Sequence, residues 1–231
     1  MDEPMAVTNG APEGARMRAP ESALRRNVAA QVAKLEAGYL ADAPWASAAL
    51  AKLRRGVGRE PGAILELAAW TTPGIYVADF REDTVAPQER AAYDAITLYA
   101  LHQQGQRGSG MHRAGRSFAA AARLLGIALG DSGRAGLVRR FNIVGTATST
   151  ASRVHHARGL IAQLRSEGIG FDYGIFADDL RKLDDPRRAD GVRMRWGREF
   201  HRPGHPRTDA GVSPAEATPS HAETAAAAVS H

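Results

Sequence analysis

Apolar residues recur every three or four positions through most of the chain, and no other sequence feature constrains the fold as strongly. This spacing puts apolar side chains on one face of an α-helix. Val28, Val32, Leu35 and Tyr39 form one such stripe. Similar stripes follow one another up to residue 202, and they predict about eight or nine helices and no sheet. We therefore expect an all-α fold.

Glycine and the chain ends divide this helical region. A Gly-rich connection at 105–115 is the natural boundary between two small helical bundles, residues 21–110 and 111–202. Residues 1–20 are rich in Gly, Pro and Ala, and residues 203–231 contain no aromatic residue. Such segments cannot bury enough apolar surface to offset the entropy of ordering, so we expect two disordered tails.

Some helix ends have a chemical signal. Pro61 is predicted to open a short helix, because proline fits the first helical position. Asp131 or Ser132 is predicted to cap a later helix, and Asp172 another. Gly168 stands where a helix-terminating glycine is expected.

Two further segments carry structural expectations. Residues 71–86 contain Pro73 and are predicted as a loop, in which the Ile-Tyr-Val stretch 75–77 could form a short strand. The three tryptophans fall at core-like positions. We expect them to anchor packing rather than to stack on bases; they are Trp45, Trp70 and Trp196.

Charge is distributed unevenly along the chain. Residues 95–166 contain ten arginines and a single acid, Asp131. Helices usually mix the two signs, because opposite charges four residues apart support the helix. A surface rich in arginine and without acids suits phosphate, to which guanidinium groups donate in pairs. The formal net charge of +5 agrees with a polyanionic partner.

Each basic group also has a simpler interpretation. Arg54 and Arg55 could complement the C-terminus of their helix. Arg139, Arg140 and the arginines of residues 153–165 could form a solvated face or dock an acidic protein. The sequence leaves these alternatives open.

Catalytic motifs are not recognisable. The chain has no Walker loop, no GxSxG and no HExxH. It has no cysteine, which excludes disulfides, zinc fingers and thiol catalysis and fits a reducing cytoplasm. No apolar run approaches the roughly 18 residues of a membrane span. We expect a protein that is not an enzyme and needs no cofactor.

Two clusters contain residue types that bind metal ions. His155 and His156 are adjacent and point about 100° apart on a helix, so they would not chelate one ion. A second cluster of four acids could hold Mg²⁺, although pairing with neighbouring basic residues is the simpler interpretation. Its members are Asp178, Asp179, Asp184 and Asp185. We expect no metal site.

Three segments resemble the CasB family, the small subunit of the type I-E CRISPR complex Cascade. They are LAKLRRGVGREPG (50–62), VRRFNIVGTATS (138–149) and LIAQLRSEGIGFDYGIFADDLRKLDDPRRADGVRMRWGREF (160–200). The last segment is the most specific, and the resemblance covers roughly residues 43–202.

The resemblance implies a non-catalytic protein within a ribonucleoprotein. Its implied partners are the backbone and large subunits of Cascade, the CRISPR RNA, the target DNA and a second copy of itself. Its implied role is to stabilise the R-loop, whose formation is nearly energy-neutral, so that a few phosphate contacts can tip the balance.

The predicted nucleic-acid-binding residues come from this resemblance and from the charge distribution. They are Lys52, Arg54, Arg55, Arg113, Arg116, Arg139, Arg140, Arg153, Arg158, Arg165, Arg195 and Arg198. The chain departs from the family at Thr148 and Gly159, where the family often has arginine. Alternative functions are a helical regulator that reads duplex DNA, a subunit that contacts only protein, and a nuclease.

Overall fold

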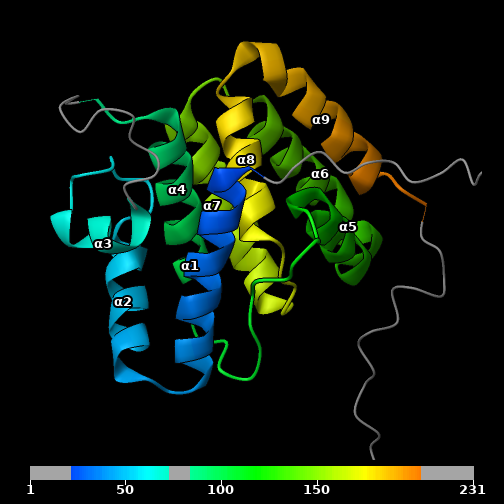
Figure 1. Cartoon of the computed structure of the whole chain (residues 1–231). Coiled ribbons are helices and arrows are strands. Elements are labelled where there is room, and N and C mark those ends of the chain that lie inside the picture. Colours follow the sequence, from blue (N-terminus) through cyan, green and yellow to red (C-terminus); the bar gives the residue numbers. More distant parts are fainter. Residues whose placement is uncertain (1–21, 73–83, 204–231) are drawn as a thin grey trace, which may run out of the picture. The chain divides into compact units, whose positions relative to one another are not determined.

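The computed structural model describes residues 22–72 and 84–203, and most of them are helical (Figure 1). In chain order the elements are α1 (Ala23–Leu40), α2 (Pro44–Arg55), the 3₁₀ helix η1 (Leu65–Leu67), α3 (Ala68–Thr71), α4 (Pro87–His102), α5 (Phe118–Ala128), α6 (Gly130–Thr146), α7 (Thr150–Ser166), α8 (Tyr173–Leu183) and α9 (Pro186–Phe200). Extended pairing in the described residues is limited to one β-bridge between His112 and Phe171. The predicted all-α class, with eight or nine helices, is confirmed.

Several helix ends follow the predicted chemistry. The Asp172 side chain accepts a hydrogen bond from the backbone N–H of Ile175 at 3.0 Å and so caps α8. Gly168 follows α7 with a φ of +63°, a left-handed conformation that favours glycine. Both predictions are confirmed.

Two predicted helix starts are wrong. Pro61 lies in a turn, and the 3₁₀ helix η1 begins four residues later. Asp131 and Ser132 lie inside the first turn of α6, which begins at Gly130 directly after α5. Leu129 ends one helix and precedes the next, so no residue between them is free to serve as a side-chain cap.

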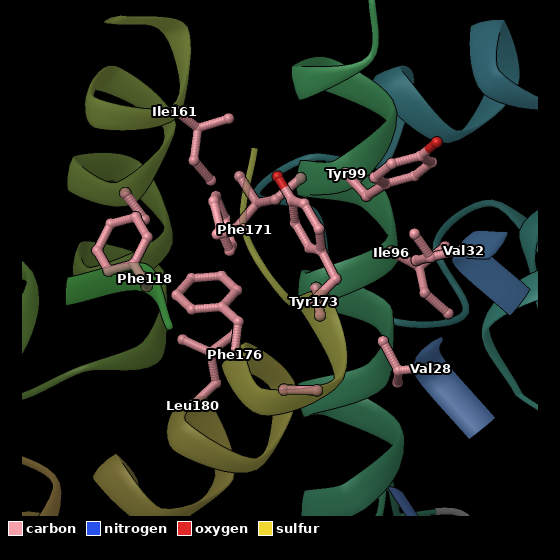
Figure 2. Close-up of a cluster of buried hydrophobic side chains, with 14 of the residues drawn as sticks. Val28, Val32, Ile96, Tyr99, Phe118, Ile161, Phe171, Tyr173, Phe176 and Leu180 are labelled. Carbon is pink, nitrogen blue, oxygen red and sulfur yellow. The ribbon is translucent and has the colours of Figure 1, made fainter. Parts of the chain in front are cut away.

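Helix α8 packs against both α1 and α4, and so joins the two ends of the sequence (Figure 1). The described residues up to His201 form one compact unit that contains every helix named above. Figure 2 shows the side chains that meet along this contact, among them Val28 of α1, Ile96 of α4 and Phe176 of α8. The core is therefore shared between the two predicted bundles, and the boundary between them stays a prediction.

The Gly-rich connection between α4 and α5 is tied to the core at several points. Gln103 Nε2 donates to the Ser109 carbonyl at 3.0 Å, and the Met111 N–H donates to Gln103 Oε1 at 2.8 Å. The His112 N–H donates to Glu36 on α1 at 2.8 Å. Glycine here permits a close approach, because a Cβ at Gly110 would overlap the Glu36 carboxylate.

Some expectations concern residues that the structure does not describe. The predicted tails and the Ile-Tyr-Val stretch 75–77 lie outside the described residues, apart from Pro203. None of the described helices has the length and apolar character to cross a membrane.

Candidate nucleic-acid interface

The α6–α7 hairpin presents three of the predicted arginines to solvent. The two helices pack against each other and are joined by the short turn 147–149. In an antiparallel helix pair, positions equally far from the turn lie at about the same height, which places Arg140 level with His156. Arg139 and Arg140 on α6 and Arg158 on α7 are all exposed.

The end of α2 meets α7 beside this hairpin. A shallow pocket of about 290 Å³ is lined by Val57 and Gly58, just after α2, and by Arg158 of α7. The last turn of α2 carries Arg54, which is half-buried, and Arg55, which is exposed. The pocket thus places the end of α2 beside Arg158 of α7, and α6 packs against the same helix α7. We name five of the predicted arginines on these three helices the α2–α6–α7 surface: Arg54, Arg55, Arg139, Arg140 and Arg158.

The charges of this surface are not neutralised within the described part of the chain. None of its five guanidinium groups lies within 4.0 Å of a described carboxylate. Guanidinium stays protonated at any physiological pH. It attracts an approaching anion more strongly where the protein partly excludes solvent. The surface therefore presents fixed positive charge to an incoming anion.

Arg153 does not belong to this surface, although the sequence predicts it as a contact. It is 1% exposed and pairs with Asp184, while its Nη2 donates to the Ala147 carbonyl at 2.9 Å. The sequence contained a signal for this burial. Arg153 precedes Ala157 and Leu160 by four and seven positions, so it lies in the apolar stripe of α7.

Arg116 and Arg165 are engaged with backbone carbonyls. Arg116 donates to the Gly170 carbonyl at 3.1 Å, and Arg165 donates to the Leu101 carbonyl at 3.3 Å. Arg165 also contacts Gln104 Oε1 at 3.2 Å, which ties the end of α7 to the end of α4. Both side chains are half-buried and hold neighbouring segments together.

Lys52 and Arg195 form ion pairs. Lys52 Nζ lies 2.8 Å from Glu66, and both side chains are largely exposed. Arg195 pairs with the buried Asp179, which also accepts a hydrogen bond from Trp196 Nε1 at 2.7 Å. Burial raises the pKa of Asp179, although the Arg195 guanidinium opposes that effect. A phosphate would have to compete with a carboxylate for either cation.

Arg113 and Arg198 are exposed on other elements. Arg113 lies in the connection before α5, where its backbone N–H donates to the Phe171 carbonyl at 3.0 Å. Arg198 lies in the last turn of α9. Neither residue is on α2, α6 or α7, so the twelve predicted residues do not form one surface.

Arg59 and His155 are exposed beside the α2–α6–α7 surface but were not among the predicted contacts. Arg59 follows α2 closely in the chain, and His155 lines the same pocket as Arg158. His155 lies two positions after Arg153 on α7, about 200° around the helix, and therefore faces away from the core. The angular position of His155 relative to the apolar stripe of α7 could therefore have indicated its exposure from the sequence.

The four aspartates that could form a metal site each contact a different partner. Asp178 accepts from Ser22 Oγ at 2.6 Å, Asp184 pairs with Arg153, and Asp185 caps α9 by accepting from the Arg187 N–H at 3.0 Å. Within residues 22–72 and 84–203, no three His, Asp or Glu side chains lie together in a way that could hold a metal ion. The simpler interpretation, pairing with basic neighbours, describes all four: the partners of Asp178, Asp179, Asp184 and Asp185 are Lys182, Arg195, Arg153 and Arg188.

Comparison with known proteins places the chain in a family. The family model described as CRISPR-associated protein Cse2 matches residues 49–201. The chain belongs to the Cse2 family. The predicted resemblance is thus confirmed, and the matched Cse2 region includes every predicted contact residue.

Solved structures agree with this Cse2 assignment. The crystal structure of CasB from Thermobifida fusca is 33% identical, with a TM-score of 0.65, over 79% of this chain and 99% of that chain. A chain titled CRISPR RNA-guided surveillance complex shares the fold at 22% identity, with a TM-score of 0.57, over 77% of this chain and 95% of that chain. A search of curated proteins gave no match.

Proposed function

We propose that this Cse2-family chain is the non-catalytic small subunit of a type I-E Cascade ribonucleoprotein. In this role it stabilises the R-loop by contacts to phosphates that do not depend on base sequence. Its partners are the backbone and large subunits, the CRISPR RNA, the target DNA and a second copy of itself. Family membership and the likeness to CasB support the assembly.

The observation that carries the proposal is the α2–α6–α7 surface. Five arginines on three helices are exposed or half-buried, the end of α2 lies beside Arg158 of α7, and no described carboxylate neutralises the five charges. Contacts of this kind release counterions from a nucleic-acid backbone and give affinity without reading bases. In an R-loop, where the exchange of strands is nearly energy-neutral, such contacts favour the opened state.

The outer face of α7 does not favour the alternative of a duplex-reading regulator. Helix-turn-helix proteins read bases with side chains that reach into the major groove. The exposed positions of α7 include Ala151 and Gly159, which cannot make such contacts, beside His155 and Arg158. We therefore propose backbone contacts as the mode of binding.

Salt dependence tests the proposal directly. Binding of the purified chain to single-stranded and duplex DNA is measured by fluorescence anisotropy over a range of NaCl concentrations. We expect weak binding that is indifferent to sequence. Arg54→Ala, Arg139→Ala and Arg158→Ala should each reduce the log–log salt slope by about one unit, because each removes one phosphate contact.

Arg188→Ala is the matched control. Arg188 is also exposed, but it pairs with Asp185 at 3.4 Å. Its removal should leave the slope nearly unchanged. If the three surface variants behave like this control, the assignment of the surface is wrong. Binding to one duplex sequence alone would favour the regulator instead. Cleavage that depends on a divalent metal would indicate a nuclease.

The assembly is tested by tagging the chain in its native cell. We expect co-purification with other Cascade subunits and a small CRISPR RNA. Recovery of the tagged chain without RNA would contradict the proposed ribonucleoprotein, even if the isolated chain binds DNA.

A further inference from the structure

One indole of the protein is exposed although the sequence places it at a core-like position. Trp45, in the first turn of α2, is 44% exposed. Its ring is parallel to that of Trp70, with an angle of 3° between the planes and 5.9 Å between the centroids. Trp70 is half-buried at the end of α3. The prediction that all three tryptophans are core anchors is therefore wrong for Trp45.

The orientation of Trp45 is fixed by its neighbours. Trp70 stacks on it, and Gly38 of α1 lies against its six-membered ring. A Cβ at Gly38 would overlap Cζ2 and Cη2 of Trp45, so glycine is what lets the ring lie there. An aromatic ring that is already ordered loses little conformational freedom when a planar ligand stacks on its open surface.

Positive charge adjoins the stacked pair of Trp45 and Trp70. The Lys34 ammonium lies 5.7 Å from the centre of the Trp70 ring, on the side of α1. Four exposed residues of α2 follow one another at helical spacing and form a stripe that spans about 80° around the helix axis. They are Trp45, Ala48, Lys52 and Arg55. The stripe is about 15 Å long, a length that a few nucleotides of extended strand can follow.

The basic end of the stripe reaches the surface described above. Arg55 belongs to the α2–α6–α7 surface, and Lys52 lies one turn before it. Lys52 pairs with Glu66, but both side chains are about half exposed, at 47% and 59%. Ion pairs so exposed contribute little and can exchange for a phosphate.

We propose that Trp45 is a stacking site for an unpaired nucleobase, and that the strand's phosphates follow Lys52 and Arg55 along α2. This proposal rests on the proposed function for the presence of an unpaired strand. It adds a preference for single-stranded over duplex nucleic acid, which phosphate contacts alone do not give. Stacking tolerates any base, because every base has a π-face.

The test uses the full chain with a short oligothymidylate and with an abasic oligonucleotide of the same length. Trp45→Ala should weaken binding of the oligothymidylate at least about five-fold, while Trp45→Phe retains most of the affinity. The salt slope should not change, because the number of neutralised phosphates is the same. The abasic strand should bind the wild type and Trp45→Ala equally.

The outcomes separate this proposal from the proposed function. Equal affinity of the wild type and Trp45→Ala for the oligothymidylate overturns the stacking site, whatever the arginine variants do. If Trp45→Ala also fails to enter the native assembly, Trp45 is a protein-docking residue. A changed salt slope in the arginine variants tests only the proposed phosphate contacts and does not bear on the stacking site. Circular dichroism of both tryptophan variants shows whether each is folded.

Discussion

At the scale of single residues, Arg153 and Arg158 have opposite environments although both belong to α7. Arg153 is buried and paired with Asp184, whereas Arg158 is exposed beside the pocket next to α2. Removing the Arg153 side chain would leave a cavity and take the donor from the Ala147 and Leu183 carbonyls, whereas Asp184 is exposed and can be hydrated. Removing an exposed side chain without a partner changes stability little.

Arg153→Ala should therefore lower the free energy of unfolding by about 3 kcal/mol, and Arg158→Ala by no more than about 0.5 kcal/mol. Urea unfolding measures both. Arg153→Met should recover part of the loss, because methionine refills much of the cavity. Equal effects of the two alanine variants would contradict the burial of Arg153.

The burial of the Asp94 carboxyl makes the free energy of unfolding depend on pH. It is 3% exposed on α4, and Oδ2 has no hydrogen-bond partner among the described residues. Burial raises the pKa of Asp94 to about 7, against the opposing charge of Arg90. Because the folded carboxyl holds its proton more tightly than the unfolded one, this group makes stability fall as pH rises from about 4 to about 7.

Asp94→Asn should remove this dependence and raise the free energy of unfolding at pH 8 by up to about 4 kcal/mol relative to the wild type. Urea unfolding of both proteins at several pH values measures the difference. Burial lowers the pKa of His102 to about 3. This histidine is present in both proteins, so its contribution to the pH dependence cancels in the difference between them. A constant difference between pH 4 and pH 8 would contradict the raised pKa.

At the scale of elements, the helix caps differ in how many segments they join. Among the described residues, the Ser149 hydroxyl accepts only from the Ser152 N–H, at 3.2 Å, at the exposed start of α7. Asp172 caps α8, accepts from the Gly115 N–H at 2.8 Å, and lies 3.6 Å from the Arg25 guanidinium. Asp172 thus joins α1, the Gly-rich connection and α8.

Ser149→Ala should lower the free energy of unfolding by about 1 kcal/mol, the usual contribution of a cap. Asp172→Ala should cost about 2 kcal/mol more, because the Gly115 N–H loses its acceptor and the Arg25 guanidinium loses one nearby carboxylate. Asp172→Asn keeps the cap and should fall between them. Chemical denaturation of the three variants gives this order, and equal losses for the two alanine variants would contradict it.

At the scale of the whole molecule, the core joins the two predicted bundles. Helix α8 packs against both α1 and α4. Its Tyr173 meets Tyr99 of α4 at 5.2 Å between ring centroids, and its Phe176 meets Phe118 of α5 at 4.9 Å (Figure 2). Elements that share a core tend to unfold together.

Hydrogen exchange tests this cooperativity. The slowest amides of α1 and α4 should report the same free energy of opening as those of α5 and α6, within about 1 kcal/mol. A fragment of residues 22–110 should show little helix by circular dichroism, because α1 and α4 lose α8. Independent folding of that fragment would favour two separate domains at the predicted boundary.

The local part of this fold could be predicted from the sequence. Apolar spacing identified most helices, and Asp172 and Gly168 marked helix ends, because a helix depends on contacts three and four residues apart. The same sequence misplaced the starts near Pro61 and Asp131, where the packing of neighbouring elements outweighs the local preference.

The sequence by itself determined an all-helical Cse2-family protein with an arginine-rich stretch, residues 95–166, that contains a single acid, since composition and periodicity belong to the chain. Only the tertiary structure decided which partner each side chain meets. It paired the buried Arg153 with Asp184, a residue 31 positions later, and it left Trp45 44% exposed beside Gly38 and Trp70. The neighbour that covers each flank of a helix comes from distant sequence, and helical periodicity contains no information about it.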